Sequence, residues 1–428
     1  MKTITKYITL SLLSLFVMAG SAFAQFTSEL QYYTYQDQRG LNVFEAPFTT
    51  NIDFDGVAFK IGGANTLQFQ GLNQSNNGAV PLSGLESNFN LATSNLDLDV
   101  ALDSGLRMHL RTYLTSRHHT EPYVKSGYFQ IDRLDFIKEG FLSEVMDKVR
   151  IKIGHMEINY GDTHFRRSDN GSAILNPFVG NYIMDSFSTE VSGELYYFDN
   201  GILAMVGLSN GKLNQSTVAS SNKTTPNLYG KLGYDKQVNE NLRFRLTGSV
   251  LTSSESASLY LYSGDRAGSR YYGIFGDSFT SGRFAPDYTV SGRAPGGPIS
   301  GEMTSFMLNP FIKLQGLELF GVYEAVSGKL ATESESRSYD QYGAELLYRF
   351  GAEEDFYLGG RFNQVSGELA SGDNIDITRF NVGGGWFLTK NILAKVEYVT
   401  QQYDGFAANS MYADGEFNGV MMEAVISF

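Results

Sequence analysis

Most of this chain consists of segments in which every second residue is apolar or glycine and the residues between are polar. The clearest is Leu242-Arg-Phe-Arg-Leu-Thr-Gly-Ser-Val250, and residues 106–114 follow the same pattern. A period of two is the period of a β-strand whose two faces meet different surroundings. The pattern predicts an all-β protein, but it does not separate a soluble sandwich from a membrane barrel, because both give each strand one apolar face.

The lengths of the segments and of their connections favour the barrel. Several segments have about 10 to 13 residues, which is longer than the usual soluble strand and close to what a tilted strand needs to cross a bilayer. Tight turns are expected at Asp103–Ser104, Asp199–Asn200, Gln315–Gly316 and Leu388–Asn391. They alternate with long polar connections at 73–88, 161–186, 211–225, 254–301 and 404–416. Short turns at one end and long loops at the other are typical of outer-membrane barrels.

Sixteen antiparallel strands account for this pattern. They are expected at about 56–72, 89–101, 105–116, 127–138, 148–160, 187–198, 201–210, 226–235, 242–253, 302–314, 317–329, 339–349, 355–367, 376–388, 392–403 and 417–428. An even number is what a closed barrel with both chain ends in the periplasm requires. Splitting the first strand at Gly62–Gly63 and adding residues 29–36 would give eighteen strands instead.

The first 24 residues predict a signal peptide. Lys2 and Lys6 precede an uncharged apolar run, and Ala22-Phe-Ala24 is a signal-peptidase pattern, so cleavage is expected between Ala24 and Gln25. We expect residues 25–55 to form a periplasmic lead-in and residues 56–428 to form the barrel. The expected location is the outer membrane of a Gram-negative bacterium.

Composition excludes several classes of function. The chain has no cysteine, which removes thiolate catalysis, Cys-ligated zinc and iron–sulfur clusters, and its net charge of −13 gives no support for binding to nucleic acid. His118 and His119 adjoin Glu121, but adjacent strand residues face opposite sides, so a metal site is not favoured. With no nucleophile, phosphate-loop or metal motif, we expect no cofactor and no enzyme, and a barrel hydrolase is the least favoured alternative.

The last strand carries a short signal of its own. Val420, Met422, Ala424, Ile426 and Phe428 lie on one face, and the sequence ends on Phe428. This resembles the terminal aromatic signature of outer-membrane proteins, so Phe428 is the expected assembly signal for the barrel assembly machinery.

Two segments resemble a known group of porins. The stretch Val149-Arg-Ile-Lys-Ile-Gly-His-Met-Glu-Ile-Asn-Tyr-Gly161 and the opening Phe59-Lys-Ile-Gly-Gly63 are similar to strands of the sixteen-stranded porins related to phosphate-selective porins O and P and to DcaP-like porins. The resemblance extends, as architecture, over about residues 56–428. It implies a homotrimer of channels whose third loop folds into the lumen. Phosphate selectivity does not carry over, because the lysine and arginine binding residues of that family cannot be matched one by one.

Charged residues occupy the inward phase of many strands. Asp97 and Asp99 lie opposite Arg107 and Arg111 of the next strand, and such cross-strand pairs would neutralise much of the wall. The residues expected to line the lumen wall are Arg107, Arg111, Arg150, Lys152, Arg243, Arg245, Asp97 and Asp99.

The third loop, 161–186, is the best candidate for a pore constriction. Within it, His164, Arg166 and Arg167 would bring a positive field to the narrowest point and favour anions, although Asp162 and Asp169 lie nearby. The alternatives are a solvated outer loop and charges that pair with one another.

The connection 254–301 mixes tyrosine, phenylalanine and arginine, which would suit a lid, a stacking surface for sugars or aromatic solutes, or packing against neighbouring loops. Taken together, the sequence predicts a porin in contact with outer-membrane lipids that passes small hydrophilic solutes, anions among them, by passive diffusion. The main alternative is a non-conducting barrel used in assembly, secretion or adhesion.

Overall fold

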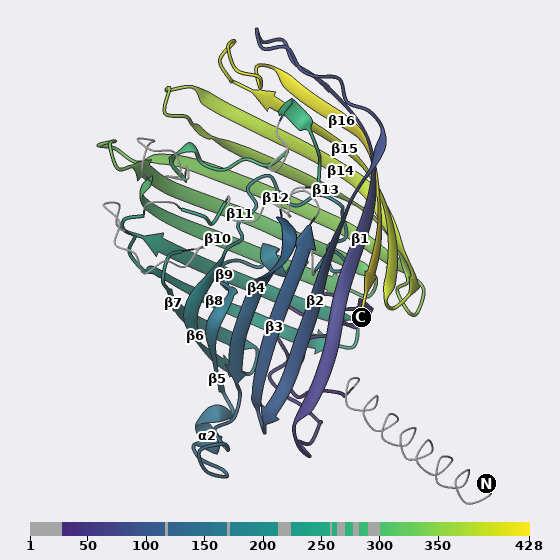
Figure 1. Ribbon diagram of the computed structural model, residues 1–428, viewed down its shortest axis with the longest axis vertical. Helices are drawn as coiled ribbons and strands as arrows, with labels where there is room; N and C mark the ends of the chain where they lie inside the picture. The colour runs from purple at the N-terminus through teal and green to yellow at the C-terminus, as the bar shows by residue number, and fades with distance from the viewer. Residues whose placement is uncertain are drawn as a thin grey trace, which may run out of the picture.

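The computed structural model describes residues 28–115, 119–168, 172–212, 224–256, 259–262, 270–276, 282–289 and 300–428. Its sixteen strands form one closed antiparallel barrel, in which each strand pairs with its neighbours in the chain and β1 pairs with β16 (Figure 1). The predicted all-β barrel of sixteen strands is therefore confirmed. The alternative prediction of eighteen strands is wrong, because residues 28–57 form no strand and β1 continues through Gly62 and Gly63.

The strand bounds agree closely with the sequence pattern in most places. They are β1 (Ala58–Ser75), β2 (Asn88–Asp103), β3 (Leu106–Thr115), β4 (His119–Ile131), β5 (Val149–Glu157), β6 (Thr189–Asp199), β7 (Ile202–Ser209), β8 (Asn227–Asn239), β9 (Leu242–Ser253), β10 (Ser300–Leu314), β11 (Leu317–Leu330), β12 (Arg337–Phe350), β13 (Phe356–Glu368), β14 (Asn374–Thr389), β15 (Ile392–Asp404) and β16 (Gly415–Ser427).

The largest difference is at β4, which was expected at 127–138. It ends at Ile131, and residues 132–148 form a turn that carries the short helix α2 (Ser143–Met146) and projects below the barrel (Figure 1). The apolar residues Leu134, Phe136 and Ile137 continue the strand pattern in the sequence, whereas the first residues of β4 are polar and have the composition of a loop. For these two reasons the strand was expected too far towards the C-terminus.

The outer face of the barrel is apolar. In β9 the side chains of Leu246 and Val250 point outward and are exposed, while those of Arg245 and Thr247 are buried inside. Near the short turns Tyr348, Phe350, Phe356 and Trp386 are exposed in the same way, as in the aromatic girdle of a membrane barrel. No helix of the described residues is long and apolar enough to cross a membrane. The apolar outer face and the aromatic girdle are those of an outer-membrane barrel of the Gram-negative type.

The tight turns lie together at one end of the barrel. Between β6 and β7 the turn residues Asn200 and Gly201 have φ of 48° and 88°, the left-handed pair that suits a two-residue hairpin. The barrel closes at the same end, where the backbone of Phe428 exchanges two hydrogen bonds with Gly63 (3.0 and 3.1 Å). A Cβ added at Gly62 would lie 2.8 Å from the Phe428 carbonyl oxygen, so this closure requires glycine.

The interior is filled more than the sequence analysis expected for a wide barrel. The described residues of the third loop, 158–168 and 172–188, lie inside the wall, together with the described parts of the connection between β9 and β10 and with residues 30–46. Their side chains form an apolar core that includes Phe44, Tyr182, Ile183, Tyr262 and Tyr271. Any site for a solute inside the barrel lies in the space that these segments leave.

Candidate functional site

The third loop crosses the lumen from β5 to the wall formed by β12–β15. It begins with a 3₁₀-helix (Thr163–Arg166). Its backbone N–H groups then donate to polar side chains of the far wall: Val179 to Glu397 (2.8 Å), Ile183 to Asn363 (2.6 Å) and Met184 to Gln341 (2.9 Å). A loop without regular pairing is satisfied in this way by the inward residues of three strands.

Cations of the same wall bind the carbonyl groups of the loop. Arg361 donates to the Gly180 carbonyl (2.7 Å), and Lys395 donates to those of Ala173 (2.9 Å) and Phe178 (3.1 Å). The described parts of the connection between β9 and β10 pack against the third loop. The Phe284 N–H of this connection donates to the Ile183 carbonyl (2.9 Å). Of the roles open to that connection, packing on a neighbouring loop is the one that its described residues show.

Asp162, one of the residues expected at a constriction, lies at the centre of a charged cluster. Arg245 donates two hydrogen bonds to its carboxylate, both 2.8 Å, and the Lys231 ammonium lies 3.0 Å away. Burial alone would raise the pKa of the Asp162 carboxyl, but Arg245 and Lys231 hold it well below its usual range. The residue is therefore an anion that binds the loop to β8 and β9.

The arginines of the third loop are also buried and paired. Arg166 donates to Glu345 (3.0 Å) and Asn42, and Arg167 makes a two-pronged pair with Asp185 (2.6 and 2.8 Å). The structure thus brings Arg166 and Arg167 into the lumen but matches each with a carboxylate, which weakens the positive field that a constriction at these positions was expected to supply.

The remaining constriction residues differ in their placement. His164 contacts Glu157 through Nδ1 (2.5 Å) and Asn159 through Nε2 (3.0 Å), and it borders open space. Asp169 lies outside the described residues.

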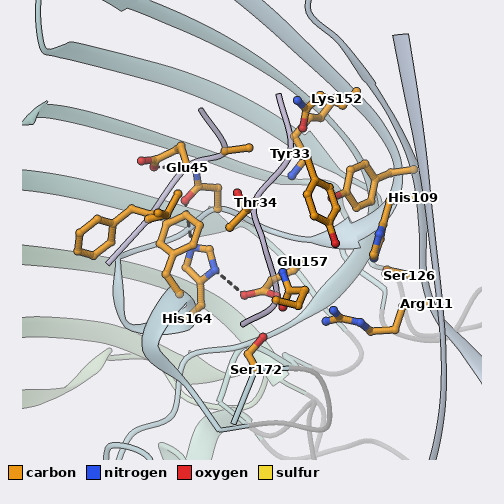
Figure 2. A pocket seen from close by; sticks show the side chains of 18 of the residues that line it. Tyr33, Thr34, Glu45, His109, Arg111, Ser126, Lys152, Glu157, His164 and Ser172 are labelled. Atoms are coloured by element: carbon orange, nitrogen blue, oxygen red, sulfur yellow. Dashed lines mark hydrogen bonds and ion pairs between the residues drawn. The ribbon is translucent and has the colours of Figure 1, made fainter. Parts of the chain in front are cut away.

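That open space is a cavity of about 190 Å³ between the third loop, residues 33–46 and the wall formed by β2–β5. Figure 2 shows His109, Arg111 and Ser126 on one side of it, with Glu157 and His164 opposite. Cations outnumber carboxylates among its lining side chains. The lysines and arginines are Arg107, Arg111, Lys125, Arg150 and Lys152, and the carboxylates are Glu45, Asp99 and Glu157.

The wall charges form the cross-strand pairs that the sequence suggested. Arg111 makes a two-pronged pair with Asp97 (2.9 and 2.7 Å), and Arg107 binds Asp99, which also lies 3.1 Å from His109. The other cations expected on the lumen wall are paired as well. Their partners are Asp132 for Arg150 (2.6 Å), Glu194 for Lys152 (3.7 Å), Asp235 for Arg243 (2.7 Å) and Asp162 for Arg245 (2.8 Å).

Some lining residues were missed by the sequence analysis. Lys125 and Ser126 belong to β4, which starts at His119, but the strand was expected to start only at residue 127, so both were left outside it. Tyr33 and Glu45 precede the barrel, and no pattern in the sequence indicates that they turn into it. No three His, Asp or Glu residues of the described chain are arranged to hold a metal ion.

Comparison with known proteins supports the fold. No protein family matches the sequence, and no curated protein does. Among solved structures, Salmonella typhi OmpF in complex with daunomycin is 10% identical over 88% of this chain and 99% of its own, with a TM-score of 0.54. Pseudomonas putida OprB is 11% identical over 87% and 94%, with a TM-score of 0.53.

The outer membrane channel DcaP of Acinetobacter baumannii is 12% identical over 88% of this chain and 99% of its own, with a TM-score of 0.51. Such identities show a shared fold, that of the porin-like outer-membrane barrel. The narrower resemblance to phosphate-selective porins O and P remains a prediction.

Proposed function

We propose that this protein is an outer-membrane porin in which small hydrophilic solutes, anions in particular, pass along the basic wall formed by β2–β5. The observation that supports this most is the cavity inside the barrel, whose lining carries more lysine and arginine than aspartate and glutamate. The porin-like fold of OmpF and DcaP is consistent with a channel. In this proposal the wall is the main source of the field, because its cations line the cavity and Arg166 and Arg167 do not.

Arginine suits a passage for anions even when it is paired. A guanidinium has five N–H donors, and a two-pronged pair with a carboxylate uses two of them. On Arg107, one N–H donates to Asp99 and another donates to Gln130 (3.0 Å), a second residue that lines the cavity. Apolar walls with little water strengthen the attraction of such cations for a passing anion.

The assembly that we propose follows the resemblance to porins. Three copies would associate, each with its own channel, and the barrel assembly machinery would recognise Phe428, which is 55% exposed on the outer face. The position of Phe428 beside the first strand fits a terminal signal that is read before the barrel closes.

Reversal potential under a KCl gradient tests the selectivity. Replacing Arg111 and Lys152 together by Gln should lower the permeability of anions relative to cations roughly threefold or more, since two fixed cations leave the cavity. Lys236→Gln removes the same kind of charge from an exposed position on β8 and serves as the matched control. An unchanged reversal potential in the double variant would contradict the assignment of the field to this wall.

One observation favours the alternative of a barrel with little conductance. The described residues of the third loop and of the connection between β9 and β10 pack together inside the wall and fill much of the lumen beside the cavity described above. Single-channel recording of the purified protein decides between the two functions. Conductance steps in groups of three would support a trimeric porin, and a folded protein that gives no steps would support a role in assembly, secretion or adhesion.

A further inference from the structure

Residues 28–57 are called the strap. Residues 30–46 of the strap lie within the short-turn end of the barrel, and every second residue from 47 to 57 is exposed. The strap contains one 3₁₀-turn (Gln38–Gly40) and no strand, so it is held by side chains and isolated backbone bonds. Its contacts are distributed around the circumference of the lumen. The Gln38 N–H donates to the Lys390 carbonyl between β14 and β15 (2.9 Å), and the Gly105 N–H between β2 and β3 donates to Gln31 (2.9 Å).

The centre of the strap is fixed by one carboxylate. Glu45 lies 2.8 Å from Arg245 of β9 and 3.4 Å from Lys231 of β8, and Asn159 of the third loop donates to it (3.2 Å). The other charged group facing it is Asp162, which shares both cations. Burial alone would raise the pKa of Glu45, but Arg245 and Lys231 hold it at about 2. Glu45 is therefore an anion at neutral pH.

Residues on either side of Glu45 extend this contact. Asn42 donates to Glu318 of β11 (2.6 Å) and accepts from Arg166. The ring of Phe44 packs edge-on against Phe165 of the third loop (5.9 Å between centroids) and Phe311 of β10 (5.4 Å). These contacts link the strap to the loop and to the wall opposite the cavity.

Arg150 holds the next part of the strap. It donates to the carbonyl groups of Ala46 (2.8 Å) and Pro47 (2.7 Å), and Phe48 stacks on Phe198 of β6 at 4.6 Å between centroids. The lining of the cavity includes Tyr33, Thr34, Gln36 and residues 43–46. The strap therefore forms the side of the cavity that faces the short turns, the periplasmic end of a barrel of this kind.

We propose that the strap is a releasable plug, which closes the periplasmic mouth of the cavity and can leave it while the barrel stays folded. The inference rests on the proposed channel function. A segment without strand pairing can detach by local unfolding, because the ladder hydrogen bonds of the wall do not depend on it. The ion pairs of Glu45 with Arg245 and Lys231 are its strongest fixed point.

Two readouts test the plug. The first is single-channel conductance. The second is the rate at which a bulky maleimide labels the variant Ser126→Cys, whose thiol would be the only one in a chain without cysteine and would line the cavity. Both are measured with the strap present, with residues 28–55 deleted, and in Glu45→Gln. Asp53→Asn, an equal loss of charge at an exposed position of the strap, is the matched control.

Deletion and Glu45→Gln should both raise the labelling rate, the latter about tenfold, since Arg245 and Lys231 keep their pairs with Asp162 while the strap loses its charged contact with both cations. Both should raise conductance, and Asp53→Asn should change neither readout. If the deleted variant does not fold, as judged by heat-dependent mobility in gels, Glu45→Gln alone decides.

The possible failures are distinct. Equal conductance and equal labelling with and without the strap would overturn the plug but leave the porin in place. Faster labelling in variants that never conduct would support the plug and overturn the channel function.

Discussion

The two sides of the lumen have the same kind of sequence and different structures. The wall of β12–β15 presents Arg361, Arg379 and Lys395, and all three donate to backbone carbonyls of the third loop. On the wall of β2–β5, Arg107 and Arg111 pair with carboxylates of the neighbouring strand and border the cavity. Alternation places a charge inside the barrel, but the path of the loop decides whether that charge binds protein or faces solute.

The wall of β12–β15 is called the covered wall, because the third loop lies on it, and the wall of β2–β5, which borders the cavity, is called the bare wall. The covered wall should govern the free energy of unfolding, and the bare wall should govern ion selectivity. On the covered wall, Glu397 accepts from the Val179 N–H of the third loop, and Lys395 donates to the Phe178 carbonyl. On the bare wall Arg107 and Arg111 are paired within the sheet, so the strands would keep their positions if one of these charges were lost.

Loss of Lys395 should have the largest effect. Its ammonium lies 2.6 Å from Glu423 and binds carbonyl groups of the third loop. Lys395→Met would leave Glu423 buried without this cation and should lower the free energy of unfolding by about 3–5 kcal/mol. Guanidinium denaturation in detergent measures this change in the free energy of unfolding. Lys390→Met, at an exposed position of the turn that precedes β15, is the control, and an equal loss there would contradict the argument.

A pair of isosteric changes tests selectivity directly. Asp97→Asn removes the partner of Arg111 on the bare wall and should raise the preference for anions roughly two- to threefold. Glu397→Gln, on the covered wall, should leave the reversal potential unchanged and loosen the third loop, because it weakens the acceptor for the N–H of Val179. Equal shifts in both variants would show that the walls do not differ in access to the solute.

Acid should release the strap. Burial alone would raise the pKa of Glu45, yet its cationic neighbours lower it from 4.5 to about 2. A lowered pKa means that the stabilising charge is fully present above about pH 4.5 and is lost as the pH falls towards 2. Conductance should rise over that interval, as should cleavage of residues 28–57 by pepsin. Glu45→Gln should show neither change, and the same acid response in that variant would assign it to another group.

The sequence predicts the wall of this molecule far better than its contents. Alternation, tight turns such as the one expected at Asp199–Asn200 and found one residue later, and the terminal Phe428 each report a local property of a strand or hairpin, so strand number and order follow from them. The pairing of Asp97 with Arg111 follows too, because register places them opposite each other.

What fills the barrel could not be predicted in the same way. Glu45 reaches Lys231 from a position 186 residues away in the chain, and neither residue has a neighbour in sequence that indicates the contact. The arginines Arg166 and Arg167 were expected to supply a free positive field, since their partners Glu345 and Asp185 are brought to them only by the folded loop.

The smallest effect is expected for a charge pair outside the lumen. Arg133 and Asp147 lie 2.6 Å apart in the turn between β4 and β5, where their side chains are 30% and 55% exposed. Water screens such a pair, so Asp147→Asn should change the free energy of unfolding by less than about 1 kcal/mol, against the several expected for Lys395→Met. Denaturation of the two variants under one set of conditions gives the comparison. An equal loss of unfolding free energy in both variants would contradict the argument. It would mean that burial by the third loop is not the reason why the covered wall stabilises the protein.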